Sequence, residues 1–158
     1  EIERTARDFT LITQNVDGLH DLAGSDRVLK LHGDIWRLRC AHCSYRGSNR
    51  QIPLQPLPPR CECGAVLRPD IVWFGEALPP HTLEQAWRCS QNADLFLVIG
   101  TSALVQPAAS LPLAAKRRGA RLLEINLQQT VLSRVADISL LGPSAEILPQ
   151  LAAADTLI

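Results

Sequence analysis

A chain of 158 residues, 46% of them hydrophobic and 20% charged, is long enough for one domain with a substantial core, or for a domain with a small insertion. Basic and acidic residues number 16 each, so the net charge of zero gives no reason to expect binding to nucleic acid or to an anionic membrane. No apolar run approaches the roughly 20 residues of a membrane span and no leader is recognisable, so we expect a soluble, cytoplasmic protein.

The first informative stretch begins with a short apolar run, residues 9–13, that predicts a buried strand. This strand leads into a turn rich in amide, carboxylate and glycine, residues 14–18. Open α/β sheets bind ligands beyond the carboxyl ends of their strands, so the turn indicates a binding site. A second short strand, residues 28–31, then leads into His32.

His32 is the candidate general base, because histidine can take up and return a proton near neutral pH. Together with the polar turn at 14–18 it predicts one reaction site. The alternative interpretation is structural: a capped turn followed by a loop histidine whose hydrogen bonds are satisfied.

Four of the five cysteines form two short pairs, which favours a metal site over disulfides. These are Cys40 and Cys43 and, after 17 intervening residues, Cys61 and Cys63. Two such pairs brought together by a hairpin supply the four soft ligands of tetrahedral zinc. The second pair has one intervening residue and a tighter bite. His42 is an alternative ligand, and four unligated surface cysteines are the other interpretation.

The segment between the cysteine pairs contains several prolines, so it is not expected to build a core. We therefore expect the metal to hold this module together. Four protein ligands leave no open coordination position, so the expected role of the zinc is structural.

The rest of the chain alternates between expected strands and helices. A continuous apolar run at 94–100 is typical of a central parallel strand covered on both faces. Further strands are expected at 36–40, 71–74, 121–126 and 137–141, and helices at 18–23, 79–89, 107–118, 130–136 and 145–151. This alternation predicts an α/β fold, a doubly wound Rossmann-like parallel sheet with a small inserted zinc-ribbon module.

In order, the motifs TQNVDGLH, LHG, CxxC…CxC, RPDIVWFGE, GTSALVQPAA, EIN and GPSAEILPQL resemble the sirtuins, the NAD-dependent protein lysine deacylases. The resemblance covers nearly the whole chain. LHGDIWRLRC and LRPDIVWFGE are most similar to the bacterial type that includes lysine desuccinylases. We expect residues 1–36 and 68–158 to be two parts of an NAD-binding domain, and residues 37–67 to be the zinc module.

The resemblance implies a role for each group of residues. His32 would be the general base acting on the hydroxyls of the nicotinamide ribose. The pocket for nicotinamide and its ribose would be lined by Gln14, Asn15 and Asp17. The adenosine ribose, the neighbouring phosphate and the adenine would be held by Gly100, Thr101, Ser102, Asn126, Gly142 and Ser144. The acyl-lysine tunnel would be bordered by Val72, Phe74, Gly75 and Glu76, and structural zinc would be bound by Cys40, Cys43, Cys61 and Cys63.

The implied reaction removes acyl groups from protein lysines and yields nicotinamide, O-acyl-ADP-ribose and free lysine. The acyl oxygen attacks C1′ of the ribose as nicotinamide leaves, and a neutral base then deprotonates a ribose hydroxyl, which suits His32. Asp17 would lie beside the positive charge that develops on the ribose. The substrate peptide would join as an added strand through main-chain bonds, which tolerates many sequences. The expected partners are acyl-lysine proteins or peptides, and the expected state is a monomer.

The first strand and the glycine-rich loop of the family are missing, as is the Tyr-x-x-Arg pair that reads a succinyl or malonyl carboxylate. We therefore expect the chain to be the C-terminal part of a longer sirtuin, with weakened NAD affinity when alone. Two other functions remain open. One is a non-catalytic zinc- and nucleotide-binding remnant, and the other is an NAD-dependent mono-ADP-ribosyltransferase. The neutral charge and the few aromatics of the zinc module predict no nucleic-acid role.

Overall fold

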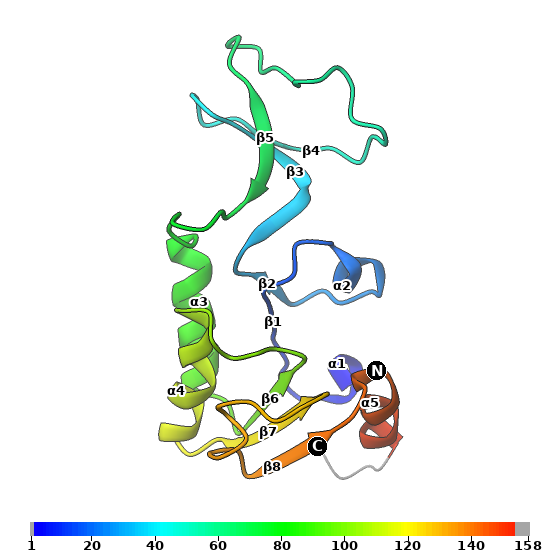
Figure 1. Ribbon diagram of the computed structural model, residues 1–158, viewed down its shortest axis with the longest axis vertical. Coiled ribbons are helices and arrows are strands. Elements are labelled where there is room, and N and C mark those ends of the chain that lie inside the picture. Colours follow the sequence, from blue (N-terminus) through cyan, green and yellow to red (C-terminus); the bar gives the residue numbers. More distant parts are fainter. Residues whose placement is uncertain (1, 154–158) are drawn as a thin grey trace. The chain divides into compact units, whose positions relative to one another are not determined.

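The computed structural model describes residues 2–153 of the chain, which falls into two compact units. Unit 1 comprises Glu1–Thr10 and Glu84–Ile158, and unit 2 comprises Leu11–Leu83. Figure 1 labels the elements of both units. No helix within residues 2–153 has the length and apolar character needed to cross a membrane.

Unit 1 is built on a parallel sheet in the order β6–β7–β8 (Figure 1). Its strands are β6 (Leu95–Ile99), β7 (Arg121–Asn126) and β8 (Ile138–Leu141). Its helices are α1 (Ile2–Thr5), α4 (Leu111–Arg117), which follows a 3₁₀ turn at Ala108–Ser110, and α5 (Ser144–Ala153). Helix α4 contacts β6 and β7, and α5 contacts β7.

The central strand of unit 1 is β7, whose Leu122 and Ile125 are completely buried. Leu122 packs with Val98 of β6 and with Leu132 from the loop after β7. The apolar run at 94–100 does form a parallel strand, but within the described sheet β6 occupies an edge. Burial of aliphatic side chains is therefore the main source of stability in this unit.

Unit 2 contains two small sheets. In one, β1 (Leu11–Thr13) pairs in parallel with β2 (Val28–Lys30). In the other, β3 (Gly33–Cys40) lies between β4 (Arg46–Ser48) and β5 (Leu67–Ile71), and both pairings are antiparallel. The short helix α2 (Leu19–Leu22) follows β1, and α3 (Pro80–Gln91) begins in this unit and continues into unit 1.

The fold class expected from the sequence is confirmed, since the chain has a parallel Rossmann-like sheet and a four-cysteine module. The helical segment expected at 107–118 is present, as the 3₁₀ turn followed by α4. Two local predictions were wrong: the strand expected at 71–74 lies at Leu67–Ile71, and residues 130–136 form turns instead of a helix. In the last case hydroxyls replace helical acceptors: Ser133 Oγ accepts from the Thr130 amide and Thr130 Oγ1 accepts from the Leu132 amide.

Candidate functional site

The polar turn after β1 is held by its own side chains. The hydroxyl of Thr13, which is buried, accepts a hydrogen bond from the Asn15 amide at 3.1 Å. Asp17 Oδ1 accepts from the Leu19 amide at 2.9 Å, which starts helix α2. One carboxylate oxygen of Asp17 therefore already accepts a hydrogen bond from the backbone. Asn15 is exposed.

Trp36 of β3 fixes the same turn from outside. Its indole Nε1 donates to the carbonyl of Asp17 at 2.6 Å, and the preceding Ile35 amide donates to the Val16 carbonyl at 2.9 Å. Gly18 has a φ of +74°, and a Cβ there would lie 2.9 Å from Cδ1 of Trp36. Only glycine fits both this backbone conformation and the space beside the indole ring. Gly18 and Trp36 therefore together determine the shape of the turn.

His32 is held beside this turn. The fully buried Leu31 donates its amide to the carbonyl of Thr13 at 3.0 Å, which extends the pairing of β1 and β2. The ring Nδ1 of His32 lies 3.0 Å from the carbonyl oxygen of Gln14. A carbonyl can only accept, so Nδ1 carries the proton and the lone pair of the neutral ring is at Nε2. The structure thus brings His32 and the polar turn together, as the sequence predicts.

Gly33 allows the chain to leave His32 and enter β3. It has a φ of +82°, and a Cβ would lie 2.0 Å from the carbonyl oxygen of Asp70 in β5. On the other side, the Val72 amide donates to the His32 carbonyl at 2.9 Å. The backbone around His32 is therefore anchored to both β1 and the end of β5.

An ion cluster adjoins His32 in the sequence. Lys30 Nζ lies 2.6 Å from Asp34, which is 8% exposed, and 2.7 Å from Asp21 of α2. The hydrogen bond from Lys30 lowers the pKa of Asp21. Burial opposes the charge of Lys30, but the two carboxylates outweigh it and raise the pKa of that ammonium group. The cluster ties α2 to the segment that carries His32.

In unit 1, the carboxyl ends of β6, β7 and β8 are joined edge to edge. The Gly100 amide donates to the Ile125 carbonyl, and the Gly142 amide donates to the Asn126 carbonyl, each at 2.9 Å. The Asn126 carboxamide donates to the carbonyl of Thr101 at 2.8 Å. The structure therefore brings together the predicted nucleotide residues of this unit: Gly100, Thr101, Asn126 and Gly142, with the exposed Ser102 next in sequence and Ser144 opening α5.

Glu124 is a buried carboxylate beside the candidate nucleotide site, and the sequence analysis did not identify it. It is 1% exposed, and its carboxylate accepts hydrogen bonds from the hydroxyls of Thr130, Ser133 and Ser139. Burial alone would raise the pKa of Glu124, but the three donors outweigh it and the pKa is lowered. Glu124 thus fastens the loop that follows Asn126 to β7 and β8. An acidic residue inside an otherwise apolar strand was the available signal.

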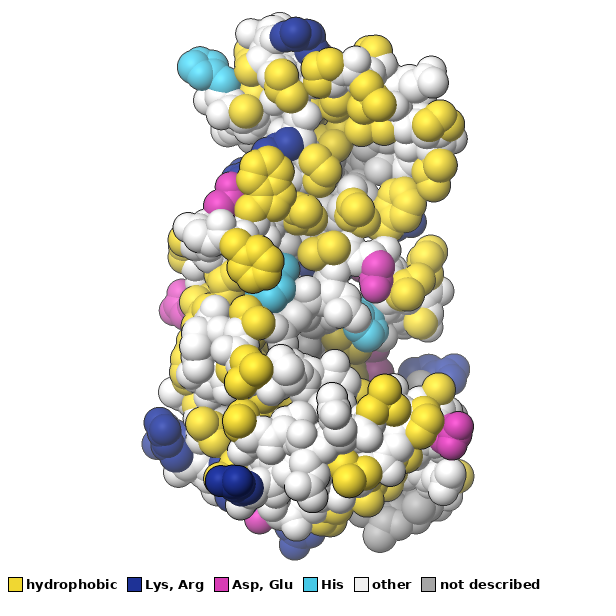
Figure 2. All heavy atoms as spheres, viewed as in Figure 1, with side chains coloured by type: hydrophobic (Ala, Val, Ile, Leu, Met, Phe, Trp, Pro, Cys, Tyr) yellow, Lys and Arg dark blue, Asp and Glu magenta, His cyan; other side chains and the backbone are white. Residues whose placement is uncertain are grey.

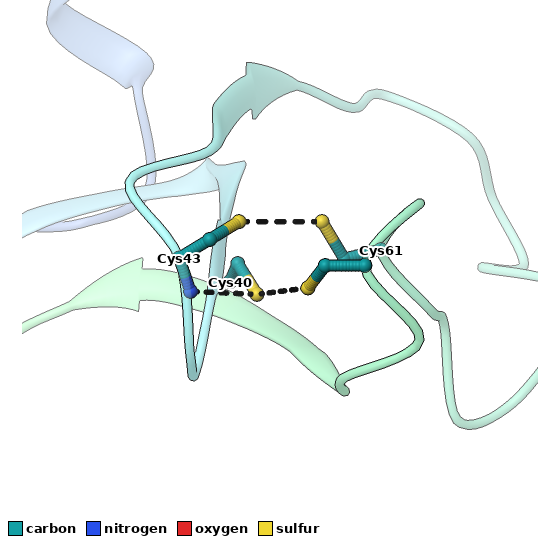
Figure 3. Close-up of side chains that lie close together, drawn as sticks. Cys40, Cys43 and Cys61 are labelled. Carbon is teal, nitrogen blue, oxygen red and sulfur yellow. Dashed lines mark hydrogen bonds between the residues drawn. The ribbon is translucent and has the colours of Figure 1, made fainter.

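The four cysteines of unit 2 form one cluster. Their sulfur atoms all lie within 4.8 Å of one another, and those of Cys40 and Cys63 are 3.5 Å apart. The sulfurs of Cys43 and Cys61 are 3.7 Å apart, as Figure 3 shows beside Cys40. A tetrahedron of sulfurs about 2.3 Å from zinc has edges of about 3.8 Å, so the cluster fits this ion. The sulfurs suffice without His42, which contributes its amide to Cys40 Sγ at 3.3 Å.

The electrostatics of the cluster also call for a cation. Amide donors from Cys43 and His42 lower the pKa of the Cys40 thiol to about 6. At Cys61, the amide of Cys63 favours the thiolate, but burial and the neighbouring thiols outweigh it and raise the pKa to about 12. Four sulfurs this close cannot all ionise unless a positive charge compensates them, and a bound zinc ion would supply it.

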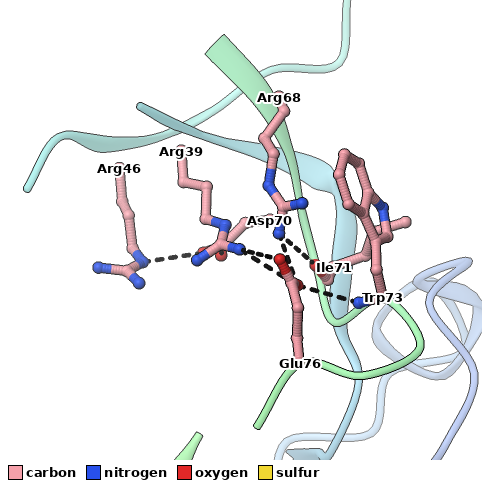
Figure 4. A network of polar contacts seen from close by, with 7 residues as sticks. All are labelled: Arg39, Arg46, Arg68, Asp70, Ile71, Trp73 and Glu76. Carbon is pink, nitrogen blue, oxygen red and sulfur yellow. Dashed lines mark hydrogen bonds and ion pairs between the residues drawn. The ribbon is translucent and has the colours of Figure 1, made fainter. Parts of the chain in front are cut away.

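The segment predicted to receive the substrate follows β5. Val72 is half-buried, whereas Phe74 is 101% exposed and Gly75 has a φ of +85°. Hydrophobic side chains reach the surface over the part of unit 2 around β3 and β5 (Figure 2). The carboxylate of Glu76 is engaged with Arg39 and Arg68, two residues that the sequence analysis did not assign (Figure 4).

Comparison with known proteins places this architecture in a family. The Sir2 family model matches residues 1–107. The NAD-dependent protein deacylase 1 of Caldanaerobacter subterraneus subsp. tengcongensis is 53% identical over 139 residues, which cover 87% of this chain and 57% of that protein. A Sir2 homologue in complex with NAD is 47% identical and superposes with a TM-score of 0.92, over 96% of this chain and 60% of the homologue.

A third comparison, with a Sir2–p53 peptide–NAD⁺ structure, gives 32% identity and a TM-score of 0.89 over 99% of this chain and 67% of that one. The chain belongs to the Sir2 family, the sirtuins. It spans 57–62% of the length of its curated relatives from Caldanaerobacter, Aquifex and Archaeoglobus.

Proposed function

We propose that this chain carries the base, the zinc module and much of the nucleotide site of an NAD-dependent protein lysine deacylase. The observation that carries the proposal is the His32–Gln14 contact in a sirtuin chain: with Nδ1 bound to the carbonyl, Nε2 is the ring atom left to accept a proton, next to the polar turn. The relatives bear the name NAD-dependent protein deacylase, and a similar structure contains NAD.

NAD, when bound, supplies the ADP-ribosyl group to which the acyl group is transferred as nicotinamide leaves. The residues of this chain then have separate tasks. His32 Nε2 accepts the proton of a ribose hydroxyl, while its Nδ1–H bond to Gln14 keeps the ring in one tautomer. Asp17 and Asn15 line the nicotinamide end, and the strand ends of unit 1, from Gly100 to Ser144, bind the adenosine end.

The proposed substrates are acyl-lysine proteins and peptides, which would pair with the segment that contains Val72, Phe74, Gly75 and Glu76. A related structure contains a p53 peptide, which supports a peptide substrate. The zinc module at 37–67, between the two parts of the NAD-binding domain, has a structural task because its four sulfurs use all the tetrahedral positions. We further propose a monomeric, cytoplasmic protein.

The test is mass spectrometry after incubation with NAD and with acetyl-, succinyl- and malonyl-lysine peptides. The assay uses this chain and, in parallel, this chain joined to the part of the Caldanaerobacter relative that it does not match. We expect deacylated peptide together with O-acyl-ADP-ribose, and the most active peptide identifies the acyl preference. His32→Ala should lower kcat by about 10²–10⁴-fold, the usual contribution of a general base.

His81→Ala is the matched control, because His81 is exposed on α3 and should leave the rate unchanged. Near-normal deacylation by His32→Ala would refute the role of that residue. ADP-ribosylated peptide in place of deacylated peptide would favour the transferase. NAD binding without any product, in both forms of the chain, would favour the non-catalytic remnant.

A further inference from the structure

Two arginines face each other directly on the sheet that carries the metal centre. In the antiparallel register of β3 and β5, Arg39 is the partner of Arg68. Like charges on directly opposed cross-strand positions destabilise a sheet unless a counter-charge is present. Asp70 of β5 meets this need only in part, since it lies 3.8 Å from Arg39 Nε and 3.1 Å from Nε of a third arginine, Arg46.

Glu76 supplies the missing counter-charge from outside the sheet. Arg39 Nη2 donates to both oxygens of the Glu76 carboxylate at 3.2 Å, and Arg68 Nη2 donates to Oε2 at 2.7 Å (Figure 4). A single carboxylate therefore bridges both members of the opposed pair. Its position five residues beyond the end of β5 makes it part of the following turn rather than part of the sheet.

The same carboxylate organises that turn. Glu76 Oε2 accepts the backbone amide of Trp73 at 3.0 Å, and the Glu76 amide donates to the Trp73 carbonyl at 3.0 Å. The Arg68 guanidinium lies 3.7 Å from the centroid of the Trp73 ring, which adds a cation–π contact. Residues 73–76 are thus closed on themselves and tied to β3 and β5 by the same few groups.

The arginines that hold Glu76 lie next to the cysteine cluster. The next cross-strand pair after Arg39 and Arg68 is Cys40 with Leu67, and both of these side chains are buried. Cys40 and Leu67 belong to the small buried cluster that also contains Leu38 and Cys61. A metal that holds Cys40 and Cys61 would therefore also hold the strand ends from which Arg39 and Arg68 extend.

We propose that Glu76, together with Arg39 and Arg68, is a positioning cluster that fixes the 73–76 turn to the metal-bearing sheet. The turn presents the fully exposed Phe74 to an incoming acyl-lysine peptide, so the cluster sets peptide affinity without touching the reacting atoms. The role in peptide affinity rests on the proposed function, whereas the fixing of the turn does not. Glu76 is thereby a clamp for the turn and not a wall of the acyl-lysine tunnel.

Hydrogen exchange of the Trp73 amide tests the clamp directly on this chain. Glu76→Gln keeps the shape of the side chain and removes its charge, and the charge-assisted bonds to Arg39 and Arg68 weaken with it. We expect exchange of the Trp73 amide to accelerate by about tenfold. The matched control is Arg46→Gln, which removes an arginine of the same network that contacts Asp70 but not the turn. It should leave Trp73 exchange unchanged.

A second variant guards against general unfolding. Arg68→Gln leaves Glu76 bound to Arg39 and should accelerate Trp73 exchange by less than Glu76→Gln does. In both variants the Cys61 and Leu67 amides, which are bonded to the Ala65 and Pro59 carbonyls, should stay protected and show that the module is folded. Unchanged Trp73 exchange in Glu76→Gln, or equal acceleration in Arg46→Gln, would overturn the clamp.

Kinetics separate the clamp from the proposed activity. The kinetic test uses whichever of the two chains in the deacylation assay is active. In that chain Glu76→Gln should raise the peptide KM by about tenfold, while kcat and the NAD KM stay within about twofold. Faster Trp73 exchange with an unchanged peptide KM would support the fixing of the turn by Glu76 but would refute a role of the turn in peptide binding. A fall in kcat with unchanged peptide KM would overturn the positioning role and place Glu76 in the chemistry.

Discussion

The sheets of the two units are stabilised in different ways. The β6–β7–β8 sheet has a core of aliphatic side chains, and Leu122 and Ile125 in its central strand are completely buried. In the buried cluster beside the β4–β3–β5 sheet, two of the four residues, Cys40 and Cys61, are predicted metal ligands. The outer contacts of this second sheet are ion pairs of Arg39, Arg46 and Arg68 with two carboxylates.

This difference shows how a sirtuin chain can carry two sheets whose stability responds to different conditions. Burial of aliphatic area stabilises the first sheet without any ligand. Half of the buried cluster of the second sheet consists of cysteines, so ligation and charge must supply much of its stability. Metal removal and salt should therefore act mainly on unit 2, and the proposed peptide-binding turn depends on the same contacts.

The largest expected effect comes from removing one cysteine. Cys43→Ser should reduce bound zinc from one equivalent to well below one, because metal affinity and folding of such a module are the same free energy, about 10–16 kcal/mol for small zinc domains. We expect fast hydrogen exchange throughout β3 and β5, with β6–β8 still protected. Metal analysis and exchange measured on one sample check both statements.

Cys89→Ser is the control for that experiment, because Cys89 lies in unit 1, where its sulfur accepts a hydrogen bond from the Thr10 hydroxyl. It should keep its zinc and the protection of both sheets. If Cys43→Ser kept one equivalent of zinc, or if β6–β8 lost protection along with β3, the contrast between the two sheets would be wrong.

A smaller effect is expected where β3 meets β5 next to His32. Gly33→Ala places a Cβ against the Asp70 carbonyl, while Gly24→Ala, at nearly the same φ of +83°, meets nothing within 4 Å. Both variants bear backbone strain of about 1–2 kcal/mol, but only Gly33→Ala must also displace a strand, which adds about 2–3 kcal/mol. Urea unfolding of unit 2 should show this order. Equal losses of unfolding free energy in the two variants would mean that β5 can move away from the added Cβ at Asp70 with little cost.

The parallel strands and the cysteine module could be predicted because local patterns in the sequence indicate them: a long apolar run and paired cysteines. The sequence analysis misplaced β5 by a few residues, because the apolar run at 71–74 is a stronger strand signal than Arg68, Pro69 and Asp70. Pairing with β3 overrides that preference, and Pro69 is tolerated because β5 lies at the edge of its sheet.

The contacts that position the candidate site were harder to predict, because each joins residues distant in sequence. Nothing near Glu76 in the chain indicates that Arg39 will be its partner, and nothing near Asp17 indicates Trp36. His32 was identifiable since its motif is local, but its tautomer depends on the Gln14 carbonyl, which only the fold brings within 3.0 Å.

The smallest expected effect tests the aliphatic sheet through its one buried carboxylate. Glu124→Gln removes the charge that binds Thr130, Ser133 and Ser139, and it should lower the free energy of unfolding of unit 1 by about 2 kcal/mol at neutral pH. Because the pKa of Glu124 is lowered in the folded state, its contribution is complete above the ordinary glutamate pKa, about 4.3, and is lost as pH falls through the folded value. The stability difference between wild type and Glu124→Gln, measured by urea unfolding across pH, should therefore be constant above about pH 5 and shrink below it.

Ser102→Ala, an exposed change on the same sheet edge, should show no such pH dependence. A difference that grew on acidification would mean that burial dominates over the three hydroxyls and that unit 1 tolerates Glu124 only as a neutral acid.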